Sequence, residues 1–374
     1  MTDKQSCVYA ICKNESKFIS QWLDNMSEAD YIVVLDTGST DGTFELLKED
    51  PRVTRVEQKI INPWRFDVAR NESMKLIPED AEIFVCTDFD ELFETGWCQV
   101  LRDNWEDTDT RCHYTYAWSH NLDGEPTDVF KYDKIHTREF EWKFPVHEVL
   151  WPVNDNVDVQ FLDVGEAIYL HHFQDMKKER KYYFDLLELS VKENPEESHC
   201  RMLLAREYFA NENYEKALEE YKKVLEYDDV HLPERRLILL ETLGRCGDLS
   251  YMTNEIADAI YYYHEFLKLD YTYREPYFCL AEIYNQEGLP TLAEAMVNAG
   301  LKYSIQKYDW VERKDNWIAK DKDILGVAAY NLGRYEESAK YTREALNHDP
   351  KNFRLMKNYA AALESQVAEL KENN

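Results

Sequence analysis

The sequence predicts an α/β domain with a mixed, mostly parallel sheet over residues 1–175, followed by an all-helical domain over residues 176–374. In the first region, short apolar runs alternate with amphipathic stretches, and this alternation is typical of β-α-β units on a parallel sheet. Beyond residue 110 the pattern changes to that of strands in a mixed or antiparallel edge. After residue 176 most segments have the apolar spacing of helices.

Individual elements follow from these patterns. Buried strands are predicted in the first region from apolar runs at residues 7–12, 31–35, 53–56 and 82–86. Helices are predicted between them from the spacing of Phe18, Trp22 and Met26, and at residues 40–50 and 66–77. Later strands are predicted at residues 111–124, 130–142 and 166–173.

Composition restricts the classes of protein to which the chain can belong. Its formal net charge is -29, with 73 acidic residues, so its surface repels nucleic acid and anionic membranes. No segment approaches the ~20 apolar residues that a membrane-spanning helix needs. The N-terminus is too short and polar for a secretory signal. Its eight cysteines lack a CxxC pair, which favours reduced thiols in a cytoplasmic protein.

The motif Asp-x-Asp occurs at Asp88/Asp90, Asp107/Asp109 and Asp321/Asp323. The second copy lies in a polar loop and the third at the start of a repeat helix, where acidic residues are usually solvated caps. Asp88 and Asp90 instead follow a buried strand, and open α/β sheets bind ligands at the carboxyl ends of their strands. Carboxylate oxygens at that position suit Mg²⁺ or Mn²⁺, which would bridge a diphosphate.

Two further segments in this region carry candidate binding residues. Asp36 ends a buried strand, and Thr40 or Asp41 can cap the helix that follows. The cap does not require Asp36, whose carboxylate is suited to accept the imide N–H of a uracil ring. Arg70 lies near the start of a predicted helix, where a cation gains nothing from the helix dipole. A pyrophosphate and a salt bridge to a nearby acid both remain open as its partner.

The histidines of interest lie in FPVHEVLW (144–151) and YLHHFQD (169–175). His147 is a potential metal ligand, and the next residue, Glu148, is a potential general base. His171 and His172 alternate across a strand, so at most one of them faces the site. The loop AICKNES lacks the GxGxxG of a dinucleotide site, and GxxxxGK[ST] occurs nowhere. These absences argue against an NAD enzyme or a nucleoside triphosphatase.

Six segments in this order resemble family 2 glycosyltransferases with the GT-A fold: AICKNES, VVLDTGSTDGT, WRFDVARN, TDFDE, FPVHE and HHFQDMKKERKYYFDLLEL. The resemblance covers about 170 residues. It is strongest to bacterial members fused to tetratricopeptide repeats, including peptide S-glycosyltransferases and some lipopolysaccharide-core transferases. It implies a Rossmann-like GT-A domain that moves a sugar, with inversion, from a nucleotide diphosphate sugar to an acceptor. UDP is the favoured nucleotide because of the argument for Asp36.

The resemblance also implies roles for individual residues. The nucleotide would be bound by Asn14, Glu15, Asp36, Arg70 and Asp88. The cofactor would be Mn²⁺ or Mg²⁺, bound by Asp88, Asp90 and His172. Glu148 is the first choice for the catalytic base, and His147 is the second. Phe89 stands where the family has alanine, which leaves both carboxylates intact but changes the pocket.

The helical half resembles the tetratricopeptide-repeat family. Paired-helix repeats are predicted at residues 202–228, 276–303 and 324–352, with a looser copy at 231–270. One repeat cannot bury its apolar face alone, so the copies are expected to stack into a solenoid. Its concave face is expected to hold a peptide, protein or glycan acceptor, or a second copy of the chain.

One alternative to a peptide transferase is a transferase that acts on a glycan or lipopolysaccharide core. Two further alternatives belong to other functional classes. The first is a repeat scaffold with a catalytically inactive transferase-like domain. The presence of all four candidate site carboxylates is evidence against it: Asp36, Asp88, Asp90 and Glu148. The second is a nucleotidyltransferase, which would release pyrophosphate. The segment ICKNESK lacks the glycine-rich, lysine-containing loop that such an enzyme usually carries.

Overall fold

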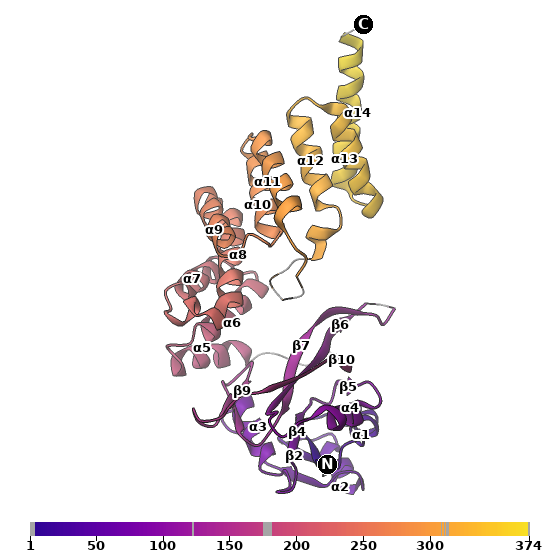
Figure 1. Ribbon diagram of the computed structural model, residues 1–374, viewed down its shortest axis with the longest axis vertical. Helices are drawn as coiled ribbons and strands as arrows, with labels where there is room; N and C mark the ends of the chain where they lie inside the picture. Colours follow the sequence, from indigo (N-terminus) through magenta and orange to yellow (C-terminus); the bar gives the residue numbers. More distant parts are fainter. Residues whose placement is uncertain are drawn as a thin grey trace. The chain divides into compact units, whose positions relative to one another are not determined.

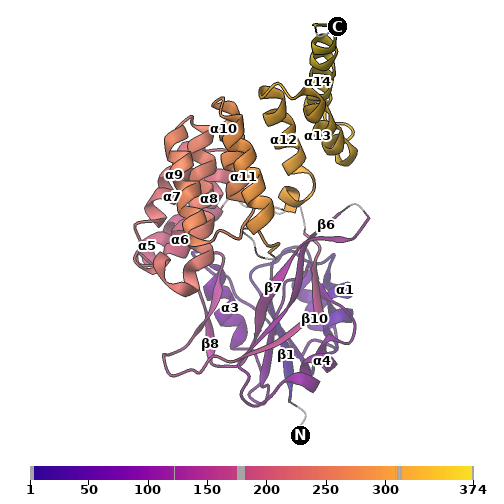
Figure 2. The same ribbon diagram turned by 45° about the horizontal axis from the view of Figure 1, so that its top comes forward.

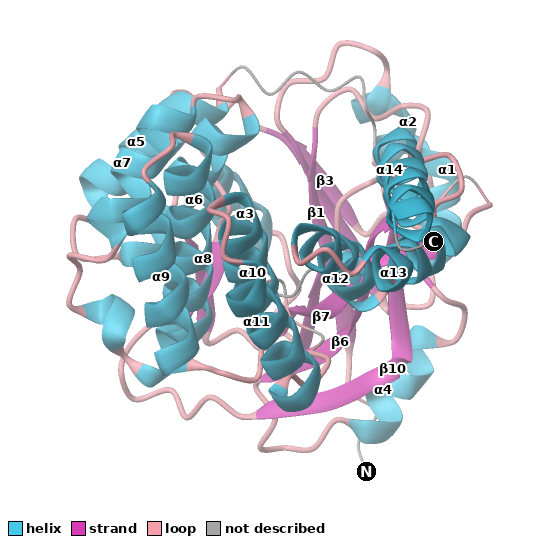
Figure 3. Cartoon of the chain, turned by 90° about the horizontal axis from the view of Figure 1, so that it is seen from above, coloured by secondary structure: helices cyan, strands magenta, loops and turns pink. Residues whose placement is uncertain are grey.

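The computed structural model describes residues 4–121, 123–174, 182–307, 309, 311 and 314–372. The chain divides into two compact units, Met1–Ser190 and Val191–Asn374. The first unit contains a sheet and helices, whereas the described residues of the second contain helices without strands (Figure 3). The predicted boundary between residues 175 and 176 lies outside the described residues.

The first part of the sheet is built from strands that alternate with helices, as the sequence predicts (Figure 1). Its strands are β1 (Ser6–Cys12), β2 (Tyr31–Asp36), β3 (Arg55–Gln58) and β4 (Ile83–Cys86). The helices between them are α1 (Ile19–Met26), α2 (Thr43–Glu49) and α3 (Phe66–Met74). Within this part, β1 pairs in parallel with β2 and β4, and β2 pairs in parallel with β3.

The sheet continues beyond β4 with longer strands. They and the neighbouring short elements are β5 (Glu91–Phe93), α4 (Trp97–Asn104), β6 (Arg111–His120), β7 (Pro126–His136) and β10 (Phe161–His172). Figure 2 labels three of these strands, β6, β7 and β10. The strand order is β3-β2-β1-β4-β7-β6-β10-β5. Strand β7 is antiparallel to β4 and β6, whereas β10 is parallel to β6 and antiparallel to β5. The sheet is therefore mixed.

Two apolar cores stabilise this unit, one on each face of the sheet. Val8 and Val34 pack with Trp22 of α1 in the first core. Cys7 and Tyr9 belong to the second, which includes residues of the small sheet formed by β8 (Phe140–Lys143) and β9 (Val149–Pro152). Neighbouring residues of β1 thus face opposite cores, as the alternation of a strand requires. Burial on both faces explains why these strands are continuous apolar runs in the sequence.

The second unit is a series of paired helices. Its main pairs are α6 (Ser198–Ala210) with α7 (Tyr214–Val224), α8 (Arg236–Met252) with α9 (Ile256–Leu269), α10 (Glu275–Gln286) with α11 (Pro290–Tyr303), and α12 (Lys320–Asn331) with α13 (Tyr335–His348). Helix α5 (Tyr183–Glu193) spans the division between the two units, and α14 (Phe353–Glu372) follows the last pair. Small residues allow close helix contacts. A Cβ atom added at Gly247 of α8 would lie 2.7 Å from the ring of Tyr263 in α9.

No helix in the described part of the chain is long and apolar enough to cross a membrane.

Candidate functional site

A cavity of about 610 Å³ lies in the first unit. Cys12 and Lys13 line it from the end of β1, and Asp88 and Asp90 line it from the loop after β4. Strands β2 and β3 lie on one side of β1, and β4 lies on the other, so the strand order reverses at this point. Open α/β sheets bind ligands at the carboxyl ends of strands where the order reverses. The cavity is therefore in the position where this fold class places a ligand.

Arg70 of α3 connects two carboxylates at the cavity. Its Nη2 lies 3.0 Å from Oδ1 and 3.2 Å from Oδ2 of Asp88, and its Nε donates a hydrogen bond to Glu148. Burial alone would lower the pKa of Arg70, but Asp88 and Glu148 outweigh burial and raise it, so the guanidinium stays charged. The salt bridge that the sequence left open for Arg70 is thus present, and it has two partners.

Lys134 of β7 is a second buried cation in this cluster, and sequence reasoning missed it. Its Nζ lies 3.3 Å from Oδ2 of Asp88 and 3.0 Å from Oε1 of Glu91. Burial would raise the pKa of Asp88, but Arg70 and Lys134 lower it well below its usual range. Glu91 also accepts hydrogen bonds from the hydroxyl of Tyr116 and the main-chain N–H of Asp88.

Asp90 and His172 face each other at another part of the cavity. Nε2 of His172 lies 3.7 Å from Oδ2 of Asp90, and Nδ1 lies 3.2 Å from the carbonyl oxygen of Trp118. Burial would lower the pKa of His172, but Asp90 outweighs burial and raises it. His171 is not among the residues that line this cavity, so one histidine of the pair faces it, as strand alternation predicts.

The predicted set of three metal ligands comes together only in part. A carboxylate oxygen and an imidazole nitrogen, as in Asp90 and His172, form a donor pair that fits a divalent ion such as Mn²⁺. Asp88 instead contacts two cations. Within the described residues, Asp88, Asp90 and His172 do not form a group whose ligand atoms all lie within 4.8 Å of one another. Asp88 as a metal ligand is therefore not supported by this arrangement, because Arg70 and Lys134 engage both of its oxygens.

The segment FPVHE forms a constrained loop at the cavity. Phe144 and His147 have φ angles of 77° and 51°, in the left-handed region that bulky residues rarely adopt. The main-chain N–H of Phe66, where α3 begins, donates a hydrogen bond to the carbonyl of Pro145 at 3.0 Å. His147 and Glu148 both line the cavity. Backbone strain of this kind occurs mostly at functional sites, which favours a role for this loop.

Asp36 organises the loop that follows β2. Its buried Oδ1 accepts hydrogen bonds of 2.9 Å from the main-chain N–H groups of Gly38 and Ser39 and from the side chain of Gln58. Burial would raise its pKa, but these hydrogen bonds lower it. Asp36 therefore holds the turn after β2, a role that the sequence did not predict, whereas the N-cap of α2 at Gly42 does not use its side chain. Asp36 is not among the residues that line the cavity, and its role in recognising a base stays a prediction.

Asn14 and Glu15 occupy the loop after β1, and the structure places them differently. Asn14 is exposed, and it accepts a hydrogen bond from the main-chain N–H of Thr40 at 2.8 Å while its own N–H donates to Ser39. It therefore connects the loops after β1 and β2 and does not line the cavity. Glu15 is buried and does line it. Of these two predicted nucleotide ligands, only Glu15 has access to the cavity.

Aromatic side chains form much of the remaining wall, and sequence reasoning did not select them. They include Trp64, Phe66, Tyr116, Trp118, Tyr132, Trp142 and Tyr183. Phe89, between the two aspartates, stacks on Trp22 of α1 with ring centroids 4.3 Å apart. Phe89 is thus buried in the core, and it also lines the cavity between Asp88 and Asp90.

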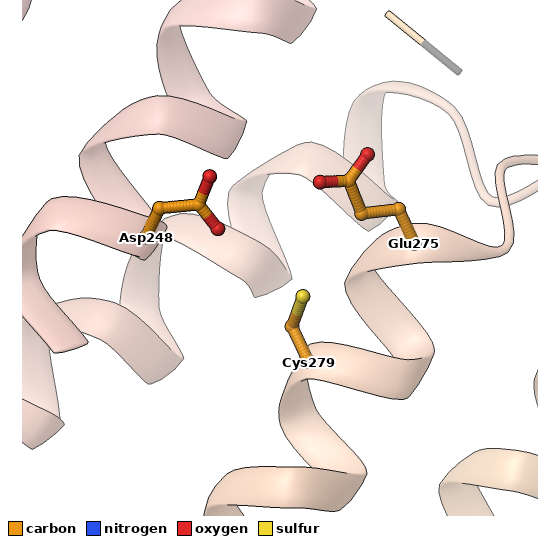
Figure 4. A group of neighbouring side chains, drawn as sticks. All are labelled: Asp248, Glu275 and Cys279. Carbon is orange, nitrogen blue, oxygen red and sulfur yellow. The ribbon is translucent and has the colours of Figure 1, made fainter. Parts of the chain in front are cut away.

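A different group of potential metal ligands lies in the second unit (Figure 4). Asp248, Glu275 and Cys279 point toward one another, and one potential ligand atom from each lies within 4.8 Å of the others. Asp248 already accepts a hydrogen bond of 2.7 Å from the hydroxyl of Tyr263, and Arg245 lies 3.5 Å away. A cavity of about 320 Å³ beside this group is lined from α6, α8, α9 and α10.

Two segments of the second unit match models of the tetratricopeptide repeat, residues 321–352 and residues 198–231. The helical half contains tetratricopeptide repeats. The first match covers α12 and α13, and the second covers α6 and α7, so each corresponds to one helix pair. The prediction of such repeats in this half is confirmed. None of the curated proteins compared with the chain is significantly similar to it.

Solved structures similar to the chain include several repeat proteins. MamA has 19% sequence identity and a TM-score of 0.36, over 46% of this chain and 87% of its own. YrrB, described as a TPR protein with an unusual peptide-binding site, has 15% identity and a TM-score of 0.38, over 49% of this chain and 85% of its own. A tetratricopeptide repeat protein from Parabacteroides merdae has 14% identity and a TM-score of 0.40, over 50% of this chain and 67% of its own.

Proposed function

We propose that the first unit is a GT-A glycosyltransferase domain that moves a sugar from a nucleotide diphosphate sugar, with UDP favoured, to an acceptor. The observation that carries the proposal is the cavity at the carboxyl ends of β1 and β4. There, Arg70, Asp88 and Glu148 form one connected charge cluster, and Asp90 and His172 lie at the same cavity. A binding scaffold has no need for such a collection of buried charges, since burying them is costly.

The cations of the cluster support binding of a diphosphate. In a chain with a net charge of -29, an anionic donor needs local positive charge. Arg70 and Lys134 supply two buried positive charges, and both now contact carboxylates, those of Asp88, Glu91 and Glu148, one of which a diphosphate would have to displace. A diphosphate offers oxygens of the same kind as a carboxylate and can bind the same donors. Arg70 and Lys134 would therefore hold the leaving group of the donor.

Asp90 and His172 would hold a Mn²⁺ or Mg²⁺ ion. When bound, such an ion stabilises the negative charge that develops on a departing diphosphate. Glu148 is the group best placed to accept a proton from the acceptor, because it lines the cavity and Arg70 fixes its carboxylate. Only one carboxylate needs to act in this way, which is consistent with inversion at the anomeric carbon.

The acceptor is proposed to be a peptide or protein held by the repeats, with a glycan or lipopolysaccharide core as the alternative. The matched repeats are the observation that favours a macromolecular acceptor, since stacked helix pairs create extended binding surfaces.

A second candidate function is that of a scaffold whose first unit is catalytically inactive. Two observations favour it: tetratricopeptide repeats are the part of the chain that matches a family model, and Arg70 and Lys134 are both paired with the carboxylate of Asp88. A scaffold would bind a protein through the repeats and leave nucleotide sugars unchanged.

Nucleotide release separates these candidates. The full chain is incubated with a panel of UDP, GDP and dTDP sugars, where water or a peptide can accept the sugar, and separately with nucleoside triphosphates and sugar phosphates. Free nucleotide diphosphate and pyrophosphate are measured with and without Mn²⁺. A glycosyltransferase releases diphosphate from one donor, a nucleotidyltransferase releases pyrophosphate from a nucleoside triphosphate and a sugar phosphate, and a scaffold releases neither. The Asp90→Asn variant should lose Mn²⁺-dependent release, whereas Asp107→Asn, at an exposed position paired with Lys4, should not. Equal release by the wild type and Asp90→Asn would exclude the assigned metal ligand.

A further inference from the structure

Two histidines face each other at the edge of the sheet, outside the cavity described above. Nε2 of His120, at the end of β6, lies 2.9 Å from Nδ1 of His171 in β10. Oε1 of Glu94, just after β5, lies 3.5 Å from Nε2 of His171. Strands β6, β10 and β5 are neighbours in the sheet, so the three side chains come from adjacent strands. Neither His120 nor His171 lines the cavity.

The partners of the two rings determine where their protons lie. A neutral imidazole carries one N–H, and the other nitrogen has a lone pair. Glu94 lies beside Nε2 of His171, so the N–H of His171 is at Nε2 and its Nδ1 has the lone pair. With the N–H of His171 at Nε2, its Nδ1 can accept a hydrogen bond, and Nε2 of His120 either donates that hydrogen bond or, with its own N–H at Nδ1, has a lone pair as well.

The two nitrogens face each other across 2.9 Å, the distance of a hydrogen bond when one proton lies between them. A metal ion can take the place of that proton, because both nitrogens then offer it a lone pair. Ring stacking holds both imidazoles in place: Phe173 stacks on His120 with centroids 5.2 Å apart, and Tyr169 stacks on His171 with centroids 4.8 Å apart. The rings are thus fixed in a geometry that presents two nitrogen ligands to one point.

We propose that His120 and His171 bind a divalent transition-metal ion such as Zn²⁺, with Glu94 orienting His171. Nitrogens at about 2.0–2.1 Å from a tetrahedral zinc ion lie about 3.3 Å apart. The two facing nitrogens need to separate by only a few tenths of an ångström from 2.9 Å to reach that spacing. A carboxylate on the outer N–H of a ligating histidine is the common arrangement around protein-bound zinc. Imidazole ligands select Zn²⁺, Ni²⁺ or Cu²⁺ over Mg²⁺.

The proposed ion would have a structural role. It would join the ends of β6 and β10, and His172 directly follows His171 at the end of β10. The side chain of His172 lies at the cavity, beside Asp90. The ion would therefore fix the strand end that carries His172. The inference does not depend on glycosyl transfer, because metal binding is measured without a sugar donor.

Calorimetric titration of the full chain with Zn²⁺ tests the proposal, using protein prepared without a polyhistidine tag. The background is a variant with Asp90→Asn, His172→Gln and Cys279→Ser, which removes the other two candidate metal groups. One Zn²⁺ ion per chain is expected to bind in this background. His120→Gln and His171→Gln should each abolish that binding event, whereas His348→Gln, at the end of α13, should not change it.

Glu94→Gln distinguishes a metal ion from a shared proton. If Glu94 orients a ligand of Zn²⁺, this substitution weakens Zn²⁺ binding roughly 10–100-fold without abolishing it. A proton shared between the histidines would give no Zn²⁺ binding in the background variant, and the proposal would then be wrong. Circular dichroism of each variant without Zn²⁺ shows whether it is folded. If the histidine variants do not fold, the Glu94→Gln titration still decides the question, because an unchanged affinity contradicts the proposal.

Discussion

The ammonium group of Lys134 lies 3.3 Å from Oδ2 of Asp88, and both side chains belong to the charge cluster at the cavity. Lys134 is buried and also contacts Glu91, so its removal would leave two carboxylates with one fewer cation. Because uncompensated buried charge is strongly destabilising, Lys134→Met is expected to lower the free energy of unfolding by about 3–5 kcal/mol.

Urea denaturation followed by tryptophan fluorescence measures this change. The matched control is Lys131→Met on the same strand, where Lys131 is exposed and forms a surface pair with Asp163. That variant is expected to change stability by about 1 kcal/mol or less. Equal effects of the two substitutions would show that the cluster around Asp88 does not require Lys134.

Glu148 is expected to act as the base of the proposed transfer. Glu148→Gln keeps an oxygen that can accept the hydrogen bond from Arg70 but cannot take a proton at neutral pH. Transfer should slow by about 10²–10⁴-fold, while the KM for the donor changes little. Initial rates of nucleotide release with a fixed acceptor give both quantities.

Two comparisons make this test specific. Glu141→Gln, at a partly exposed residue 3.7 Å from Lys143, should leave the rate unchanged. His147→Asn removes the alternative base. A larger loss in His147→Asn than in Glu148→Gln would assign the base to His147 instead.

His136 should make the stability of the first unit depend on pH. Burial lowers its pKa to about 3, and its ring contacts the hydroxyl of Tyr9 and the carbonyl of Thr137. The unfolded chain binds a proton near the ordinary histidine pKa of about 6.5, so below that pH the unfolded state gains protons that the folded state does not. Stability should fall as the pH falls from about 6.5 toward 3.

At pH 5 the contribution of His136 corresponds to a loss of about 2 kcal/mol relative to pH 7.5. His136→Gln should remove this part of the pH dependence, as measured by urea denaturation at both pH values. His348→Gln, at the end of α13, serves as the control and should retain the full pH dependence. A pH dependence that is the same in His136→Gln and in the wild type contradicts the assignment.

Close packing of α8 on α9 should make Gly247 sensitive to substitution. A Cβ atom there would lie 2.7 Å from the ring of Tyr263, whose hydroxyl is held by Asp248. Gly247→Ala is therefore expected to destabilise the second unit by about 1–3 kcal/mol through overpacking. Gly244, on the same helix, has its nearest neighbour at 3.6 Å, so Gly244→Ala should stabilise the helix by about 0.5–1 kcal/mol. Thermal denaturation of both variants shows whether the melting temperature falls in Gly247→Ala and rises in Gly244→Ala.

The parts of the fold that the sequence predicts are those specified by local patterns. Strands β1, β2 and β4 are recognisable because burial on both faces produces continuous apolar runs. The helix pairs are recognisable because their apolar spacing repeats. The position of β7 between β4 and β6 depends instead on pairings between distant segments, such as Val85 with Ile135. No local pattern specifies such a pairing.

The same distinction applies to the candidate site. Asp88, Asp90 and Glu148 follow predicted elements or belong to recognisable segments, and the structure brings all three to one cavity. Lys134 has no local signal, because a lysine in a strand of alternating residues is usually a solvated side chain. Its burial follows from the antiparallel pairing of β7 with β4, which places it beside Asp88. Asp36 shows that a carboxylate after a strand can also hold the turn that follows it, since its Oδ1 accepts hydrogen bonds from the main chain of Gly38 and Ser39.

The backbone of the FPVHE loop implies a trade-off between stability and activity. Glycine adopts φ angles of 77° and 51° without a steric penalty, whereas at Phe144 and His147 such angles cost roughly 1–3 kcal/mol each. At Phe144 the burial of the ring outweighs this penalty, whereas His147 is exposed, so a chain optimised for stability alone would have glycine at position 147. His147→Gly should therefore raise the melting temperature while giving the neighbouring Glu148 more freedom to move. The strained backbone that holds Glu148 rigidly at the cavity therefore lowers the thermal stability of the first unit.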